Sequence, residues 1–199
     1  MELGERFNRA LVRAAEIHQH QKRKCNEGDP AVPYIAHLLA VCGLVLQDGG
    51  SEDEAIAALL HDAAEDQGGE PMLDEIEDEF GPNVSEIVIE CSDTFEHPKP
   101  PWRHRKEEYL AHLPEASVSA LRVSIADKLD NARATLLDYR RLGDKLWERF
   151  DPAADQLWYY RSLVTTYRRI GGFESPLIDE LDRVVSELEG LAGVPDEDR

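Results

Sequence analysis

The sequence predicts an all-α protein, a compact single domain of eight to ten helices. Apolar residues recur with a helical period in nearly every segment, and no convincing run alternates with a period of two. Glycine and proline interrupt this pattern in four stretches that are expected to be loops: NEGDPAVP, DQGGEP, HPKPPW and GGFESP. With 199 residues, 42% of them hydrophobic, the chain is long enough to bury a sizeable core.

The helical pattern divides the chain into ten segments. They are expected at about 3–20, 33–47, 52–67, 72–79, 83–92, 103–113, 117–137, 142–149, 154–170 and 176–191. No internal repeat or low-complexity linker separates them, so residues 1–199 are assigned to one domain. Within it, the motifs described below occupy about 10–137, further helices occupy 138–191, and 192–199 form a frayed tail.

Charge and composition limit the classes of partner. A formal charge of −19 argues against DNA or RNA, which are bound through basic surfaces, and against anionic membranes. The longest apolar stretch, YIAHLLAVCGLVL, has 13 residues and is too short to cross a bilayer. The N-terminus has no signal-peptide core, and the three widely spaced cysteines are typical of a reducing compartment. A soluble, cytoplasmic protein is expected.

The predicted helix 33–47 begins at Pro33, a favoured first-turn residue, and is apolar on all sides. It should therefore be central to the core. His37 is embedded in it. A single histidine in such a helix is more often a core residue with one hydrogen bond than a ligand, so this residue alone decides nothing.

The predicted helix 52–67 opens with Ser51 and Glu54, the spacing of a capping box. At about 100° per residue, its apolar side chains fall on one side. The opposite arc holds one imidazole and three carboxylates: His61, Asp62, Glu65 and Asp66. This arc either faces water, as in any amphipathic helix, or forms part of a site.

The predicted helix 117–137 carries Asp127 on its apolar face, with Asn131 one turn later. Buried carboxylates are rare unless they are paired or bind a metal. Two interpretations follow: an ion pair with Arg122 or Arg133, or a metal site.

Together these helices offer two imidazoles and two carboxylates, from His37, His61, Asp62 and Asp127. This mixed set suits a divalent first-row ion such as manganese, iron, cobalt or zinc. Two carboxylates about 6 Å apart repel by roughly 3 kcal/mol at an effective dielectric constant of 20, so their convergence would favour a cation. Glu65 and Asp66, one turn beyond the ligands, are placed to act as general acid or base on a metal-bound water.

Four motifs now show a resemblance to a known family. In order, they are KRK with PYIAH, AALLHDAAED, the Phe80-Gly81 pair, and ADKLDNAR. In sequence and spacing they resemble the HD phosphohydrolase superfamily, and within it the hydrolase domain of RelA/SpoT-type proteins and the small alarmone hydrolases. The resemblance implies an HD-domain hydrolase fold. It also implies manganese-dependent removal of the 3′-pyrophosphate from (p)ppGpp, the guanosine alarmones of the stringent response, to give GDP or GTP and pyrophosphate.

The resemblance also implies a role for each matching residue. Metal ligands are His37, His61, Asp62 and Asp127; catalytic acids or bases are Glu65 and Asp66; substrate contacts are Arg23, Lys24, Asn131 and Tyr34. The QKRK stretch agrees with this assignment, because an anionic substrate needs a local basic patch on so acidic a chain.

The sequence also departs from the family. Cys25 and Ala134 replace residues that are often hydroxylic or acidic in the family, and the segment 91–113 does not resemble the long bifunctional enzymes. Trp102, Arg103, Arg105 and Lys106 form either a second phosphate-facing edge or, as we favour, an amphipathic helix with a solvated basic face.

Two other functions remain open. One is an HD phosphohydrolase that acts on another nucleotide phosphate, such as an adenosine alarmone or a nucleoside monophosphate. The other is a non-enzymatic, antitoxin-like binding module. The sequence does not distinguish guanine from adenine, and it leaves the oligomeric state open.

Overall fold

The computed structural model describes residues 2–25, 30–95, 98–150 and 154–194. Parts of the predicted loops at 26–33 and 97–102, and residues 195–199 of the predicted tail, lie outside these ranges. The described elements are α1 (Glu5–Ile17), α2 (Ile35–Gln47), α3 (Glu52–Leu60), the π-helical turn η1 (Ala64–Gly68), α4 (Gly69–Phe80), α5 (Pro82–Cys91), α6 (Trp102–His112), η2 (Leu113–Glu115), α7 (Val118–Leu142), η3 (Gly143–Arg149), α8 (Ala154–Arg169) and α9 (Pro176–Leu191).

These elements confirm the all-α prediction. In the described part of the chain the only extended pairing is an isolated bridge between Lys22 and Pro33. None of the described helices combines the length and the apolar character that a membrane crossing requires.

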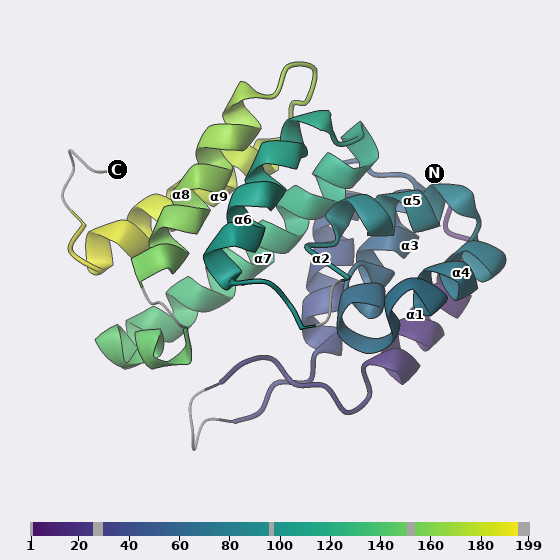
Figure 1. Cartoon of the computed structure of the whole chain (residues 1–199), viewed down its shortest axis with the longest axis horizontal. Helices are drawn as coiled ribbons and strands as arrows, with labels where there is room; N and C mark the ends of the chain where they lie inside the picture. Colours follow the sequence, from purple (N-terminus) through teal and green to yellow (C-terminus); the bar gives the residue numbers. More distant parts are fainter. Residues whose placement is uncertain (1, 26–29, 96–97, 151–153, 195–199) are drawn as a thin grey trace.

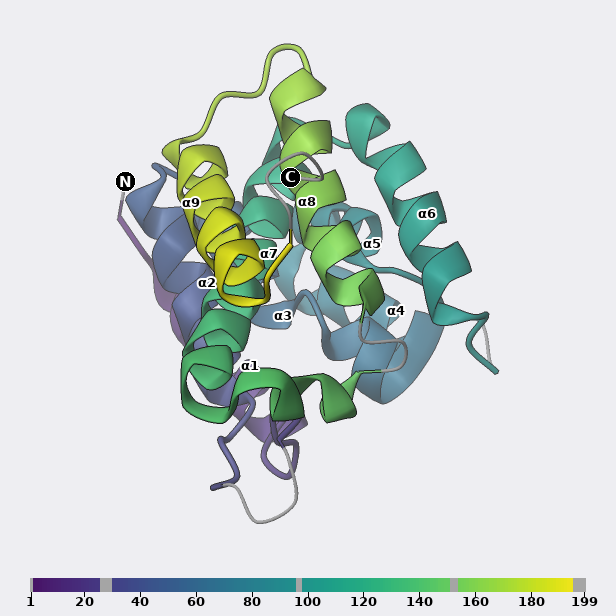
Figure 2. The same ribbon diagram turned by 90° about the vertical axis from the view of Figure 1, so that its left-hand side faces the viewer.

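The long helix α7 organises the molecule. It packs against α2, α3 and α5 on one side and against α9 on the other (Figure 1). Helix α1 packs on α3, and α4 packs on α5. Helices α8, α9 and α6 form the second side, where α8 contacts both of the others (Figure 2). A residue on α7 can therefore meet side chains from both halves of the molecule.

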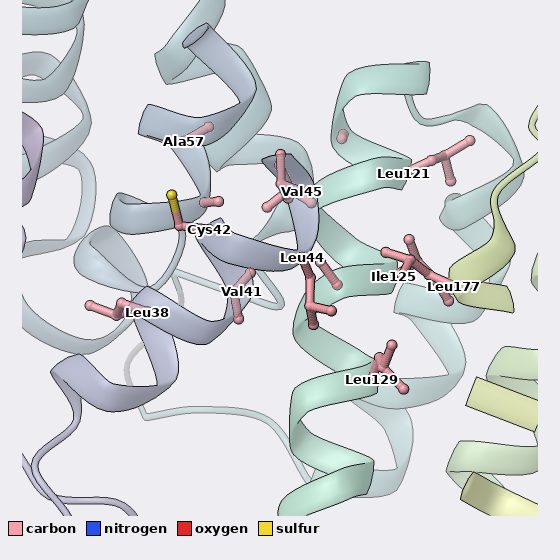
Figure 3. Close-up of a cluster of buried hydrophobic side chains, with 14 of the residues drawn as sticks. Leu38, Val41, Cys42, Leu44, Val45, Ala57, Leu121, Ile125, Leu129 and Leu177 are labelled. Atoms are coloured by element: carbon pink, nitrogen blue, oxygen red, sulfur yellow. The ribbon is translucent and has the colours of Figure 1, made fainter. Parts of the chain in front are cut away.

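The core lies where α2, α3, α7 and α9 meet (Figure 3). Leu38 and Val41 of α2 and Ile125 and Leu129 of α7 are fully buried there. As predicted, α2 is central. It is not buried on all sides, however, because Leu39 is 48% exposed.

Three predicted boundaries are wrong. The segment 52–67 is not one helix: α3 ends at Leu60, His61 and Asp62 form a turn, and η1 begins at Ala64. The predicted DQGGEP loop is instead helical, because Pro71 falls in the first turn of α4, where its missing N–H is not needed. Helix α7 continues through the predicted gap at 138–141 and ends at Leu142, capped by Gly143, whose φ of +58° favours glycine. The predicted helix 142–149 is the 3₁₀ segment η3.

Candidate active site

The four predicted metal ligands lie together at the crossing of three helices. His37 comes from α2, His61 and Asp62 follow α3, and Asp127 comes from the middle of α7. Asp127 Oδ1 lies 3.2 Å from His37 Nε2 and 3.7 Å from His61 Nε2. Asp62 Oδ2 lies 3.1 Å from His61 Nε2 and 3.7 Å from His37 Nε2. One ligand atom each of His37, His61 and Asp127 lies within 4.8 Å of the other two, a group that Asp62 does not join.

Both imidazoles are oriented by their Nδ1 atoms. His37 Nδ1 is 2.7 Å from Asp130 Oδ2, and His61 Nδ1 is 2.9 Å from the carbonyl oxygen of Ala58. Since a carbonyl and an ionised carboxylate only accept, Nδ1 carries the proton in each ring and Nε2 is left as a possible ligand. His61 Nε2 is buried and has no hydrogen-bond partner. A buried polar atom without a partner is costly, so the cluster fits a cation that accepts this lone pair.

The charges of the cluster also favour a bound cation. Burial opposes a charge on each histidine, but the surrounding carboxylates outweigh it and raise the pKa of His37 and, more strongly, of His61. Burial also opposes ionisation of Asp62 and Asp127, but the nearby histidines, and Lys128 beside Asp127, hold both carboxyl pKa values below their usual range. Without a cation, the carboxylates are therefore balanced by protons on the imidazoles.

Neighbouring side chains hold the two carboxylates. The Tyr34 hydroxyl donates to Asp62 Oδ2 at 2.6 Å, and Asn131 Nδ2 donates to Asp127 Oδ1 at 2.5 Å. Lys128 Nζ lies 2.6 Å from Asp127 Oδ2. The predicted alternative for Asp127, a pair with Arg122 or Arg133, is wrong: Arg122 pairs with Asp48 and Glu54, and Arg133 pairs with Glu180.

Glu65 and Asp66 lie in or beside the wide turn η1. A π-helical turn has more residues per turn than an α-helix, so the predicted spacing of about 100° per residue does not hold here. Both carboxylates nevertheless line the same cavity as Asp62. Glu65 accepts from the backbone N–H of Asp93 at 3.0 Å and from Lys99 Nζ at 2.8 Å. Asp66 accepts from Gln21 Nε2 at 2.7 Å.

A cavity of about 590 Å³ opens above this cluster. The predicted substrate contacts Arg23, Lys24, Tyr34 and Asn131 line it. Arg23 also reaches into the cluster, since its Nη1 lies 2.6 Å from Asp130 Oδ2 and its Nη2 donates to Asn131 Oδ1 at 2.9 Å.

The opposite wall of the cavity comes from α6 and α8. Arg105 and Lys106 line it, and their side chains are only 13% and 16% exposed and pair with Asp93. The favoured prediction of a solvated basic face is therefore wrong for these two residues. Tyr159 and Tyr160 of α8 are buried and also border the cavity.

Besides Lys128, which holds Asp127, four further residues that hold the site were not predicted: Asp130, Gln21, Asp93 and Lys99. Asp130 could have been found, because it follows Asp127 by three residues and so shares its helix face. The other three lie in or next to loops, and no periodic signal marks their partners.

The fold and the site define a helical protein with a buried His/Asp centre suited to a divalent metal. The HD domain family matches residues 10–149, and the chain belongs to this family. Membership and the cluster of His37, His61 and Asp127 together imply a divalent metal ion.

Two relatives within the family are similar in sequence to this chain. Guanosine-3′,5′-bis(diphosphate) 3′-pyrophosphohydrolase MESH1 of Xenopus tropicalis is 40% identical over 137 residues, which cover 67% of this chain and 69% of the relative. The Homo sapiens protein of the same name is 38% identical over 122 residues, or 60% of this chain and 64% of the relative.

Two solved structures share the fold. One, described as a metazoan ortholog of SpoT that hydrolyzes ppGpp, has a TM-score of 0.76 at 24% identity and covers 94% of this chain and 98% of its own. A protein of Listeria monocytogenes EGD-e has a TM-score of 0.67 at 27% identity and covers 76% of this chain and 97% of its own.

Proposed function

We propose that this protein is a metal-dependent hydrolase that removes the 3′-pyrophosphate from (p)ppGpp and releases GDP or GTP. The observation that carries this proposal is the buried cluster of His37, His61 and Asp127, with the unpartnered Nε2 of His61 at its centre, below the cavity. Relatives named as guanosine-3′,5′-bis(diphosphate) 3′-pyrophosphohydrolases support the substrate.

Asp62 completes the proposed ligand set, because its Oδ2 is close to both imidazole Nε2 atoms. Two nitrogen and two oxygen ligands suit manganese, the ion that we propose, although other divalent first-row ions accept the same set. Such an ion would lower the pKa of a bound water and stabilise negative charge on the phosphoryl oxygens.

Glu65 and Asp66 are the proposed acid and base. Both carboxylates border the cavity with Asp62, where they can take a proton from the attacking water and return one to the leaving group. Lys99 and the Asp93 N–H hold Glu65, while Gln21 holds Asp66. The two groups are thus held by different segments of the chain.

Arg23 and Lys24 are the proposed phosphate contacts. They border the cavity of a chain with a net charge of −19, so they supply the local attraction that the surface as a whole does not. Asn131 and Tyr34 are proposed to contact the substrate from the same rim. The three cysteines, Cys25, Cys42 and Cys91, are free thiols, in keeping with the cytoplasmic location that we propose.

The test is direct. Purified protein is incubated with Mn²⁺ and, separately, with ppGpp, pppGpp, an adenosine alarmone and nucleoside monophosphates, and the products are separated by ion-exchange chromatography. We expect pyrophosphate and GDP from ppGpp, and none from the His61→Ala variant. Cleavage of a monophosphate with ppGpp left intact would replace this proposal with a different HD phosphohydrolase. If none of these nucleotides is cleaved, the protein is a binding module instead.

A further inference from the structure

We infer that Gln21 is a positioning residue for the Asp66 carboxylate and that the buried side chain of His18 fixes Gln21. The kinetic part of this inference rests on the proposed function. Its structural part rests only on contacts between residues of this chain.

A short chain of hydrogen bonds connects the end of α1 to the turn η1. Gln21 Nε2 donates to Asp66 Oδ2 at 2.7 Å, across 45 residues of sequence. The other end of the same amide, Oε1, accepts from Gln67 Nε2 at 2.7 Å and lies 2.6 Å from His18 Nδ1. One glutamine side chain therefore bridges a buried imidazole and a proposed catalytic carboxylate.

The chemistry of the partners fixes the direction of each bond. An ionised carboxylate only accepts, so the NH₂ end of Gln21 faces Asp66 and its carbonyl end faces His18. His18 must then donate from Nδ1. Burial lowers the pKa of His18, so the ring is neutral and its Nε2 is a bare acceptor. This agrees with the buried Nε2 of His18 having no partner, which is less costly for a lone pair than for an N–H.

The anchor is buried and held by several contacts, whereas Asp66 is exposed. His18 is 2% exposed and stacks on Tyr34 with the ring centroids 5.3 Å apart. The backbone of Gln21 is held at both groups, since its N–H donates to the His18 carbonyl at 3.0 Å and its carbonyl accepts from Tyr34 N at 3.1 Å. Asp66, in contrast, is an exposed residue in a π-helical turn. Without an outside donor, its carboxylate could take several rotamers.

The first test is a set of Mn²⁺-dependent ppGpp kinetics. Gln21→Leu keeps the size of the side chain but cannot donate, so we expect kcat to fall by about 10- to 100-fold with KM and metal content unchanged, as for a loss of orientation. Gln19→Leu, at the exposed glutamine two residues earlier, is the matched control and should leave kcat unchanged.

A double-mutant cycle separates positioning from a general structural role. Once Asp66→Asn has removed the carboxylate, adding Gln21→Leu should cost less than threefold more, because the two residues act as a unit. If the two losses multiply fully, or if Gln21→Leu retains wild-type kcat, the inference is overturned. A wild type that does not cleave ppGpp at all contradicts the proposed function instead.

The second test does not depend on activity. Long-range ¹H–¹⁵N spectra should show the His18 proton on Nδ1 in the wild type, and on Nε2 in Gln21→Leu, since Nε2–H is the common tautomer of free neutral histidine. A wild-type proton on Nε2 would refute the network. His18→Asn, whose amide nitrogen can take the place of Nδ1, should retain more kcat than His18→Leu. Equal losses in the two variants would remove His18 from the network.

Discussion

Two buried clusters of charged residues differ in whether the chain itself completes them. Between α8 and α9, Arg161 lies 2.6 Å from Glu189 Oε2 and 2.5 Å from Asp182 Oδ1, and it donates to Ser186 Oγ at 3.0 Å. Glu189 is 2% exposed and meets the guanidinium with both oxygens. Every charge in this cluster has a partner of opposite sign.

The cluster around His61 is not complete in this sense. Its carboxylates are balanced by imidazoles that would otherwise be neutral, and His61 Nε2 has no hydrogen-bond partner. The difference suggests different roles. A complete ion network fixes the packing of two helices, whereas an incomplete one retains affinity for a cation. Five experiments test this contrast.

The largest effect is expected for His61→Ala. The variant should contain no divalent ion by elemental analysis, and its turnover of ppGpp should fall by more than about 10⁴-fold, because activation of water by a metal is worth several kcal/mol. Circular dichroism should still show a helical fold, since His61 lies in the turn after α3 and the apolar core around it is unchanged. A variant that keeps its metal would disprove the proposed centre.

Glu65→Gln and Asp66→Asn should separate chemistry from metal binding. Each keeps the shape of the side chain but loses the group that accepts a proton, so turnover should fall by about 10²–10⁴-fold. Metal content, measured in parallel, should match the wild type. Near wild-type turnover in either variant would show that its carboxylate has no acid or base role.

Arg161→Leu should lower the stability of the fold and leave turnover unchanged, the reverse of what is expected for the variants of the active site. It leaves Glu189 buried without its partner, which costs about 3–5 kcal/mol for a fully buried pair. Since the Arg161 side chain is 21% exposed, we expect a loss nearer about 2–4 kcal/mol in urea unfolding. The matched control, Arg168→Leu, removes a 49% exposed arginine and should cost less than about 1 kcal/mol. Both variants should keep wild-type kcat. A fall in kcat would mean that the two clusters are coupled.

The two clusters should also respond to pH in opposite ways. The folded pKa of His61 is raised, so its contribution to stability without metal is complete below the unfolded pKa of about 6.5 and is lost as pH rises through the folded value. Asp182 has a lowered pKa, so its contribution is present above about pH 4 and is lost only in acid.

In the proposed centre, Mn²⁺ would compete with the proton on His61. The thermal stabilisation by Mn²⁺ should therefore increase with pH, by up to about 1.4 kcal/mol per pH unit for each proton released. Calorimetry at pH 6, 7 and 8, with and without Mn²⁺, measures this difference. A shift independent of pH would argue that the imidazoles do not bind the ion.

The smallest effect is expected for Lys24→Ala. Lys24 is exposed at the rim of the cavity, so its loss should raise KM for ppGpp by about threefold to tenfold with kcat and metal content unchanged.

Arg23→Ala should raise KM and also weaken metal binding, because Arg23 contacts the Asp130 oxygen that orients His37. If Arg23→Ala affected only KM, Asp130 would not depend on it.

The sequence by itself determined the helical class and the residues of the centre. Apolar periodicity marks the helices, and a polar residue on an apolar face, such as His37 or Asp127, is visible within its own segment. The capping box of Ser51 and Glu54 was likewise local, and the structure confirms it. These signals depend on residues three or four positions apart, which a helix always brings together.

Only the tertiary structure decided which partners complete the site. It gave Asp127 the partner Lys128 where one of the two interpretations had named Arg122 or Arg133, turned Arg105 and Lys106 toward the cavity, and brought Gln21 to Asp66. It also changed the helix after Leu60 into a π-helical turn. The Gln21–Asp66 contact and the cavity that Arg105 and Lys106 line join segments far apart in the sequence, whereas Lys128 is the neighbour of Asp127 on α7. The positions of these segments follow from how the helices pack on one another, and no periodic pattern within one segment encodes that packing.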